Sequence, residues 1–401
     1  MGRVGAGTPD PGADASVPAE GLIRGRLGPW DLNWRLPCGR RIVRNVMDKG
    51  PDPIIAAHWA HVPPVPEFNV PDDIDAWIRQ RRETQTTLWR LLGRLPLRPR
   101  PVRARVEGVF EGTHSQTEKI RIDNGTGEEI PAVLLLPRQR RGPVPAILYC
   151  HWHGNEYHKG KIELFESEHT PEPPGPALVR RGYAVLAIDA PCFGARQGRG
   201  PGGLSARGAD GEAAAAKFNL WYGRTLWGML LRDDLIALDY LLSRPEIDPQ
   251  RVGVTGISMG ATRTWWLMAL DERLRAGVAL ACMTRYQDLI ARGGLNEHGI
   301  YYYVPGMLQH FDTEAVVALA APRPLLLLNG DHDPGSPAEG IRAIEAKVRQ
   351  VYRLYGTPNA FESRIFPGVG HVCTPEMWQA MLAWFERHLR PNALASAGDE
   401  G

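Results

Sequence analysis

Residues 256–260 place a serine between two glycines, in the pattern G-x-S-x-G. The short β-branched run before it, residues 251–255, is typical of a buried strand, and the apolar run 261–270 is typical of a helix. A serine on a sharp turn between a strand and a helix presents its hydroxyl for nucleophilic attack. Ser258 is therefore the predicted nucleophile, and a purely structural strand–helix turn is the alternative.

A serine hydroxyl is a weak nucleophile that needs a base, and the base needs a carboxylate to orient it. In enzymes with this turn, an acid and then a histidine follow the serine along the chain, on loops after late strands. Here an apolar strand leads to Asp331 and Asp333, and a glycine-bracketed loop carries His371. His371 is the predicted base. Asp333 is the predicted orienting acid, since Asp331 directly follows the strand and is expected to bond N–H groups of its own turn.

The oxyanion that forms during such an attack needs two N–H donors. Met259, the residue after the serine, is expected to supply the first donor from the start of its helix. The loop after the strand 145–150 is expected to supply the second. We favour the N–H of Asn155, with that of Gly154 as the alternative, because glycine permits close approach of the backbone.

The same region contains three histidines that could be metal ligands, namely His151, His153 and His158. Histidine is a common zinc ligand, but no third and fourth ligand of matching spacing follows the H-x-H pair. We therefore expect no metal and no other cofactor.

Two long irregular insertions, residues 190–222 and 284–312, are expected to leave the sheet edge on the side of the serine and to form a lid and pocket walls. The second insertion is rich in aromatic residues. The predicted substrate-pocket residues are His153, Arg285, Tyr301 and Tyr302. The alternative is that the aromatic side chains pack the lid onto the body of the protein.

The elements that must position these residues alternate between strands and helices. Strands are expected at 102–112, 117–123, 130–136, 145–150, 183–188, 251–255, 277–282, 324–329 and 361–366, and helices at 72–92, 226–243, 261–270 and 375–389. This alternation predicts an α/β fold with a mostly parallel sheet and helices on both faces.

The domain organisation follows from composition. Residues 1–20 are expected to be a disordered tail, 21–101 a helical extension, 102–391 the main domain and 392–401 a second tail. The apolar stripe of the helix 72–92 predicts that the extension packs on the main domain.

The overall composition excludes several classes of partner. The 401 residues carry 47 Lys+Arg against 45 Asp+Glu, and a net charge of +2 gives no reason to expect nucleic acid or an anionic membrane. The five cysteines contain no C-x-x-C pair, which fits a reducing compartment. No apolar run is long enough to span a bilayer, and the first residues lack the apolar core of a secretory signal. A cytoplasmic location is therefore expected.

Over residues 102–391 the chain resembles the α/β-hydrolase superfamily, and within it the branch of the dienelactone hydrolases and acetyl-xylan esterases. The resemblance rests on H-W-H-G at 151–154, D-A-P-C-F-G at 189–194, R-D-D-L-I-A-L-D-Y-L at 232–241, D-P-Q-R-V-G-V-T-G at 248–256 and A-P-R-P-L-L at 321–326. Dienelactone hydrolases carry a cysteine where this chain has Ser258, so the resemblance favours carboxylic esters over dienelactone. In the family the acid lies three residues after the glycine that ends its strand, which is Asp333 counted from Gly330.

Residues and resemblance together predict a serine hydrolase that cleaves a small or medium carboxylic ester, lactone or thioester through an acyl-enzyme. Its expected partner is the small-molecule ester, and a homo-oligomer is compatible with the sequence. Acyl transfer or C–C bond cleavage by the same three residues is an alternative. A non-catalytic binding protein is another, against which the intact serine, aspartate and histidine weigh.

Overall fold

The computed structural model describes residues 63–390. The tails predicted at 1–20 and 392–401, and the first part of the predicted extension, lie outside the described residues. The strands are β1 (Ala104–Glu111), β2 (Ser115–Asp123), β3 (Glu129–Pro137), β4 (Val144–Cys150), β5 (Ala184–Ile188), β6 (Ile247–Ile257), β7 (Ala276–Leu280), β8 (Leu325–Gly330) and β9 (Phe361–Phe366). The α-helices are α2 (Ile74–Leu92), α3 (Pro174–Arg180), α4 (Gly208–Trp221), α5 (Leu226–Ser243), α6 (Met259–Leu270), α7 (Tyr286–Ala291), α8 (Thr313–Ala318), α9 (Ala338–Leu354) and α10 (Pro375–Leu389).

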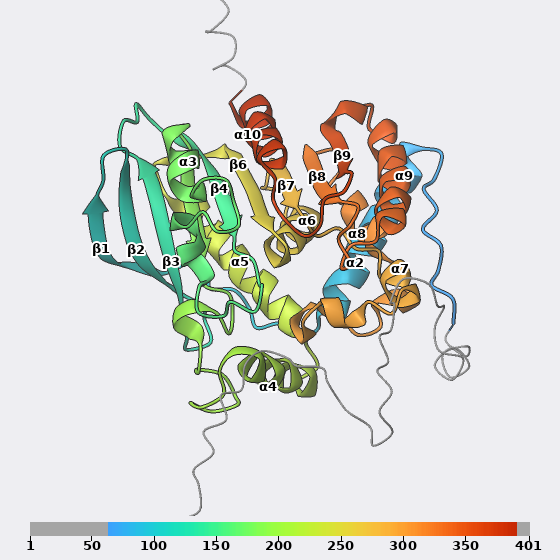
Figure 1. The fold of residues 1–401 in the computed structure, drawn as a ribbon, viewed down its shortest axis with the longest axis horizontal. Helices are drawn as coiled ribbons and strands as arrows, with labels where there is room; N and C mark the ends of the chain where they lie inside the picture. The colour runs from blue at the N-terminus through green and yellow to red at the C-terminus, as the bar shows by residue number, and fades with distance from the viewer. Residues whose placement is uncertain (1–62, 391–401) are drawn as a thin grey trace, which may run out of the picture. The chain divides into compact units, whose positions relative to one another are not determined.

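One sheet joins these strands in the order β1-β2-β3-β5-β4-β6-β7-β8-β9 (Figure 1). The first three strands and β5 pair antiparallel, and every pair from β5–β4 to β8–β9 is parallel. The carboxyl ends of the parallel strands therefore meet at one edge, where open α/β sheets bind their ligands. The predicted mostly parallel sheet is confirmed.

Helices cover both faces of the sheet because its inner strands are apolar on both faces. In β5, Ala184, Leu186 and Ile188 join the core under α2, α5, α6, α8 and α9, while Val185 and Ala187 join the core under α3 and α10. This alternation is the two-residue period of a strand. The sheet is thus the middle layer between two hydrophobic cores.

Helix α2 bears out the predicted helix at 72–92. Asp73 caps its first turn by accepting a hydrogen bond from Ala76 N–H at 2.8 Å, and Gly93 ends it. Trp77, Leu88 and Leu92 of its buried face are fully enclosed in the core that α6 and α8 share. The helix therefore packs on the main domain as its apolar stripe predicted.

Several helices were not predicted. The insertion at 190–222, expected to be irregular, contains the 14-residue α4. The 17-residue α9 was not predicted either, although its buried Ile341, Ile344, Val348 and Val351 follow the helical spacing of three and four. The insertion at 284–312 holds α7 and three short 3₁₀ turns.

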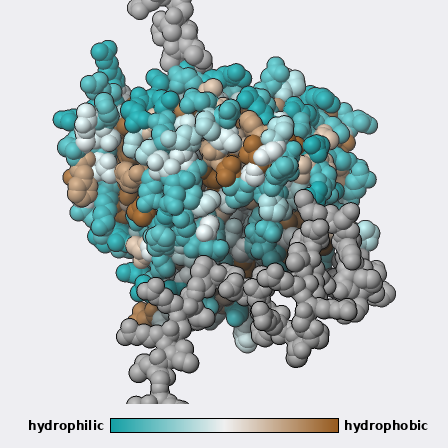
Figure 2. All heavy atoms as spheres, in the orientation of Figure 1, coloured by the Kyte–Doolittle hydropathy of each residue, from teal (hydrophilic) through white to brown (hydrophobic). Residues whose placement is uncertain are grey.

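The exposed side chains on one face of the described residues are mostly hydrophilic (Figure 2). In the view of Figure 2 hydrophilic residues cover most of the face, and apolar side chains lie in small separate groups, as is normal on a protein surface. Among the helices within residues 63–390, none combines the length and apolar content that crossing a bilayer requires.

Candidate active site

Ser258 lies on the turn between β6 and α6 with φ 57° and ψ −118°, a left-handed conformation that is costly for a serine. The flanking glycines are required by the close approach of β4. A Cβ added to Gly256 would lie 2.2 Å from the carbonyl oxygen of Cys150, and one added to Gly260 would lie 2.0 Å from the same atom. The G-x-S-x-G pattern is therefore explained by packing of the turn against the neighbouring strand.

His371 and Asp333 reach the serine from two later loops. His371 follows β9 and Asp333 follows β8, and His371 Nδ1 lies 2.7 Å from Asp333 Oδ2. On the other side of the ring, His371 Nε2 lies 2.8 Å from Ser258 Oγ. Since Nδ1–H donates to the carboxylate, Nε2 is left to accept the hydroxyl proton. The three side chains form a continuous hydrogen-bonded chain that can withdraw a proton from the serine.

The two aspartates after β8 have different partners. Asp333 is buried, and its Oδ1 also accepts the N–H of Gly335 at 3.0 Å. Asp331 Oδ1 accepts the N–H of Gly368 at 2.7 Å. Asp331 was expected to bond its own turn, but this bond crosses to the loop that carries His371. The reason is that β8 and that loop are in direct contact, since a Cβ at Gly330 would lie 1.9 Å from the Val369 carbonyl oxygen.

In the loop after β4, the N–H of Asn155, the predicted oxyanion donor, makes a contact that was not expected. Met259 is the first residue of α6, as predicted. The Asn155 N–H, however, already donates to His153 Nδ1 at 3.1 Å. Gly154 and Asn155 both have positive φ, 48° and 59°, and a Cβ at Gly154 would lie 2.5 Å from the ring of Trp152. The tight turn between His153 and Asn155 thus brings the Asn155 N–H onto a side chain of its own loop.

His153 lies behind this turn and is buried among aromatic side chains. Its Nε2 lies 2.8 Å from Glu212 Oε2, and Glu212, on α4, is 3% exposed. The imidazole stacks on Tyr301 with a centroid distance of 4.7 Å. The insertions that carry α4 and Tyr301 therefore both support the loop after β4. Glu212 was not identified from the sequence, because no motif marks a contact 59 residues along the chain.

A cavity of about 310 Å³ opens onto the serine, and its lining includes Ser258, His371, Asp333, His153 and Tyr301. Two of the predicted pocket residues, His153 and Tyr301, are thus in place. The other two are not. Arg285 is held in ion pairs with Glu314 and Asp288, and Tyr302 is 2% exposed beneath His298, on which its ring stacks at 4.2 Å. His298 and Asn296 line the cavity instead.

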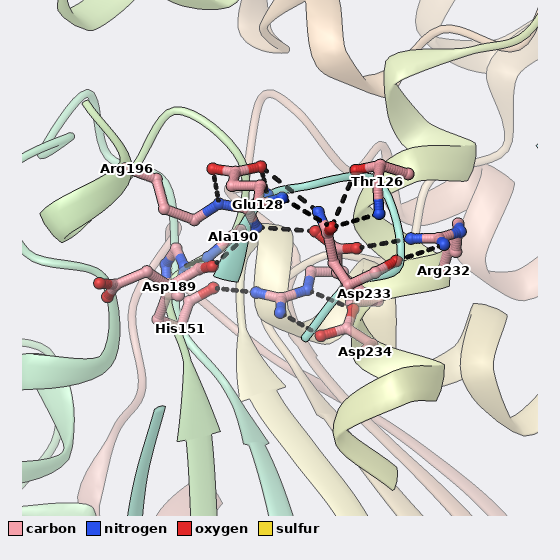
Figure 3. Close-up of polar contacts among 11 residues, drawn as sticks. Thr126, Glu128, His151, Asp189, Ala190, Arg196, Arg232, Asp233 and Asp234 are labelled. Carbon is pink, nitrogen blue, oxygen red and sulfur yellow. Dashed lines mark hydrogen bonds and ion pairs between the residues drawn. The ribbon is translucent and has the colours of Figure 1, made fainter. Parts of the chain in front are cut away.

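His151 is a structural histidine in this geometry. It is buried, its Nδ1–H donates to the Trp152 carbonyl oxygen at 2.8 Å, and its Nε2 accepts the N–H of Ala190 at 3.1 Å (Figure 3). Burial lowers the pKa of His151 well below its usual value, so the ring is neutral. Both ring nitrogens are engaged, and the side chain holds the start of the β4 loop against the loop after β5.

A buried network of charged side chains supports the same region (Figure 3). Arg196 Nη1 lies 2.7 Å from Asp233 Oδ2, and Arg196 Nη2 lies 2.6 Å from Glu128 Oε2. Arg232, beside Asp233 on α5, donates to the carbonyl oxygen of Asn124 at 2.6 Å. These contacts join the β2–β3 turn, the loop after β5 and helix α5. A charge without a partner would be costly at this depth.

One cluster of metal-ligand type was not predicted. Single ligand atoms of Glu156, Glu168 and His169 all lie within 4.8 Å of one another. The Lys159 ammonium lies among them, however, in ion pairs with Glu156, Glu166 and Glu168. These carboxylates therefore already have a cationic partner from the chain.

Comparison with known proteins points to one superfamily. A family model described as the prolyl oligopeptidase family matches residues 215–392. "Putative hydrolase YtaP" of Bacillus subtilis is 38% identical over 283 residues, which is 70% of this chain and 91% of that protein.

Solved structures share the fold at lower identity. A structure described as a "putative acetyl xylan esterase" from Bacteroides fragilis has a TM-score of 0.65 at 17% identity and covers 83% of this chain and 94% of its own. A glucuronoyl esterase from Solibacter usitatus has a TM-score of 0.57 at 17% identity, with coverage of 81% and 98%.

Proposed function

Because the chain belongs to the α/β-hydrolase superfamily and to its esterase branch, we propose that it is a serine esterase that cleaves a small or medium carboxylic ester through an acyl-enzyme. The observation that carries the proposal is the hydrogen-bonded chain from Asp333 through His371 to Ser258, with distances of 2.7 and 2.8 Å. Nucleophile, base and orienting acid stand in the order and contacts that acyl transfer requires.

The proposed reaction has two halves. His371 Nε2 takes the proton of Ser258 as Oγ attacks the carbonyl carbon, and the negative charge develops on the carbonyl oxygen. His371 then gives the proton to the departing alcohol oxygen as its bond to carbon breaks. Water, activated by the same histidine, attacks the acyl-enzyme, the acid leaves, and the proton returns to Ser258. Asp333 holds the tautomer and stabilises the charged imidazole.

The oxyanion requires N–H donors in both halves. We assign the first to Met259, at the start of α6. The second donor comes from the loop after β4. The Asn155 N–H can serve once it leaves His153 Nδ1 for the developing oxyanion, a stronger acceptor, and the Gly154 N–H is the alternative.

The polar character of the cavity supports a short acyl group. Asn155, Asn296, Glu297 and His298 line it, and aliphatic Leu, Ile, Val and Met side chains are absent from its described lining. A long acyl chain would displace water from these polar groups without replacing their hydrogen bonds. The esterase names of the structural relatives agree with an ester as the substrate.

The test is Ser258→Ala, which removes the oxygen that accepts the acyl group. We expect turnover of a short-chain ester to fall by about 10⁴-fold or more. A fluorophosphonate probe should label the wild-type protein at this position and leave the variant unlabelled. Equal labelling of both, or turnover by the variant within about tenfold of wild type, would refute the assignment. A matching anilide substrate, assayed in parallel, separates esterase from peptidase activity.

A further inference from the structure

The Asn155 N–H, proposed above as the second oxyanion donor, lies in a constrained turn. Asn155 has φ 59°, in the left-handed region that residues with a Cβ seldom adopt. Its N–H donates to His153 Nδ1 at 3.1 Å. His153, Gly154 and Asn155 all line the cavity that contains Ser258. Because the turn is part of the wall of that cavity, the hydrogen bond to His153 determines where the donor lies.

His153 can accept this hydrogen bond in only one tautomer. Nδ1 must carry a lone pair, so the proton of the neutral ring must be on Nε2. Glu212 Oε2 lies 2.8 Å from that Nε2, and a carboxylate can only accept a hydrogen bond. The carboxylate therefore keeps the proton on Nε2 and leaves Nδ1 available to the Asn155 N–H.

The two insertions hold Glu212 and His153 in place. Glu212 is buried on α4, in the first insertion. In the second, a Cβ added to Gly299 would lie 2.9 Å from Glu212 Oε1, so the chain there packs directly against the carboxylate. The His153 ring stacks on Tyr301 of the same insertion and meets Tyr157 edge to face at 5.0 Å. The packing therefore sets the orientation of the ring, while Glu212 sets its tautomer.

Resting on the proposed function, we propose that Glu212 is a positioning residue for the reaction, which acts through His153 to hold the turn that presents the Asn155 N–H to the oxyanion. Glu212 itself lies outside the described lining of the Ser258 cavity. As negative charge develops on the carbonyl oxygen, the Asn155 N–H exchanges a neutral nitrogen acceptor for an anionic oxygen, which is the stronger acceptor. The pair of His153 and Glu212 keeps the turn in place during this exchange.

Glu212→Ala removes the acceptor of the Nε2 proton, so the ring can also carry its proton on Nδ1, where it opposes the Asn155 N–H. We expect kcat for a short-chain ester to fall by about 10²-fold, as for the loss of one oxyanion donor, with KM within about threefold of wild type. In Glu212→Gln the amide oxygen can still accept the Nε2 proton. This conservative variant should keep kcat within about fivefold of wild type.

A merely structural role for Glu212 would give a different result. Labelling with a fluorophosphonate, taken to completion, counts the active sites, and kcat is expressed per labelled site, so a loss of folded protein does not mimic a loss of catalysis. Glu314→Gln is the matched control, since Glu314 is a buried carboxylate on α8 that pairs with Arg285. It should change the melting temperature and leave kcat per labelled site within about twofold.

A boronic acid gives a second and independent measurement. Ser258 Oγ bonds to the boron atom and its proton passes to His371, which leaves a tetrahedral anion that resembles the transition state. The inhibition constant should rise by about 10²-fold in Glu212→Ala and stay within about fivefold in Glu212→Gln, in parallel with kcat.

The outcomes separate this inference from the proposed function. If the wild-type protein is not labelled at Ser258 and cleaves no ester, the proposed function itself fails. If it is labelled and active, the positioning role is wrong when kcat per labelled site of Glu212→Ala stays within about threefold of wild type, or when Glu212→Gln loses as much as Glu212→Ala.

A second variant covers the case in which Glu212→Ala does not fold. The double change His153→Phe with Glu212→Leu leaves no buried charge without a partner and keeps a ring against Tyr301. The same loss of kcat, about 10²-fold, is expected for it, and a kcat within about threefold of wild type would equally refute the positioning role.

Discussion

Asp331 and Asp333 leave β8 two residues apart, and their bonding partners assign them different roles. Asp333→Asn should keep the shape of the loop, but an amide can donate to His371 Nδ1 and so favour the tautomer that cannot accept the serine proton. We expect kcat to fall on the order of 10⁴-fold. Asp331→Asn should leave kcat nearly unchanged, because the amide oxygen can still accept the Gly368 N–H. Both variants are checked by thermal melting and assayed on one ester. A kcat that is lower for Asp331→Asn than for Asp333→Asn would assign the orienting role to Asp331.

Glu163 is a buried carboxyl beneath the active-site loop that the proposed reaction does not use. Its Oε1 accepts the Tyr149 hydroxyl at 2.6 Å and its Oε2 accepts the Trp152 N–H at 2.9 Å. Burial, the largest cause, raises its pKa from 4.5 to about 7. Between these values the folded protein holds a proton that the unfolded chain releases, so this group's contribution to stability is full below pH 4.5 and is lost as the pH rises through about 7.

Glu163→Gln should remove that pH dependence, since a neutral amide can keep both hydrogen bonds if the Tyr149 hydroxyl rotates. We expect the free energy of unfolding of the wild type, relative to the variant, to fall by on the order of 1 kcal/mol per pH unit across this window. Urea unfolding at several pH values measures the difference, and other carboxylates cancel in it. A difference that is constant with pH would show that Glu163 titrates normally.

The site residues that could be predicted from the sequence are those marked by a motif or by their order along the chain. Ser258, Asp333 and His371 were named from the elbow and from the loops after late strands, and the structure brings them into contact. Glu212 and Glu163 were missed, because nothing local distinguishes them from surface glutamates. Their roles arise from burial by segments distant in the chain.

At the scale of secondary-structure elements, helix α2 packs the first described residues onto the main domain, and a substitution in it can test how much this packing stabilises the protein. The Trp77 side chain is fully buried and meets Phe68 edge to face at 6.1 Å. Trp77→Ala should lower the free energy of unfolding by about 3–5 kcal/mol, because the cavity left behind cannot collapse fully. Leu97→Ala, at a side chain that is 91% exposed, is the matched control and should have little effect. Equal melting temperatures for the two variants would mean that α2 docks only weakly.

Elements with strong periodicity or clear end signals were predicted closely. The predicted and observed bounds of α5, β9 and α10 agree, since Pro, Gly and cap residues mark their ends. Helix α4 was missed because its alanine- and glycine-rich sequence shows no apolar stripe, and its contacts come from Glu212 and Ala215 rather than from large side chains. Tertiary packing, rather than a local sequence pattern, determines that this segment is helical.

At the scale of the whole molecule, a buried ion pair joins two helices of the layer that covers one face of the sheet. Arg263 on α6 and Asp234 on α5 are both fully buried, and Arg263 Nε donates to Asp234 Oδ2 at 2.8 Å. The pair joins the helix that follows the nucleophile to its neighbour on the same face of the sheet. A buried ion pair gains little stability over apolar residues of similar size, but it strongly disfavours arrangements that separate the charges.

A double-mutant cycle distinguishes the net stabilisation by this ion pair from the cost of leaving one of its charges without a partner. Arg263→Met or Asp234→Leu alone leaves one charge buried without its partner, so each should lower the free energy of unfolding by about 3–5 kcal/mol. The double variant should lose clearly less than the sum, because no unpaired charge remains. The exposed pair Arg292–Glu339 is the control, and its single changes should each stay within about 1 kcal/mol. Urea unfolding measures all five variants. If the losses at Arg263 and Asp234 simply add, then the two charges do not act as a pair, and α5 and α6 are held together by their apolar contacts alone.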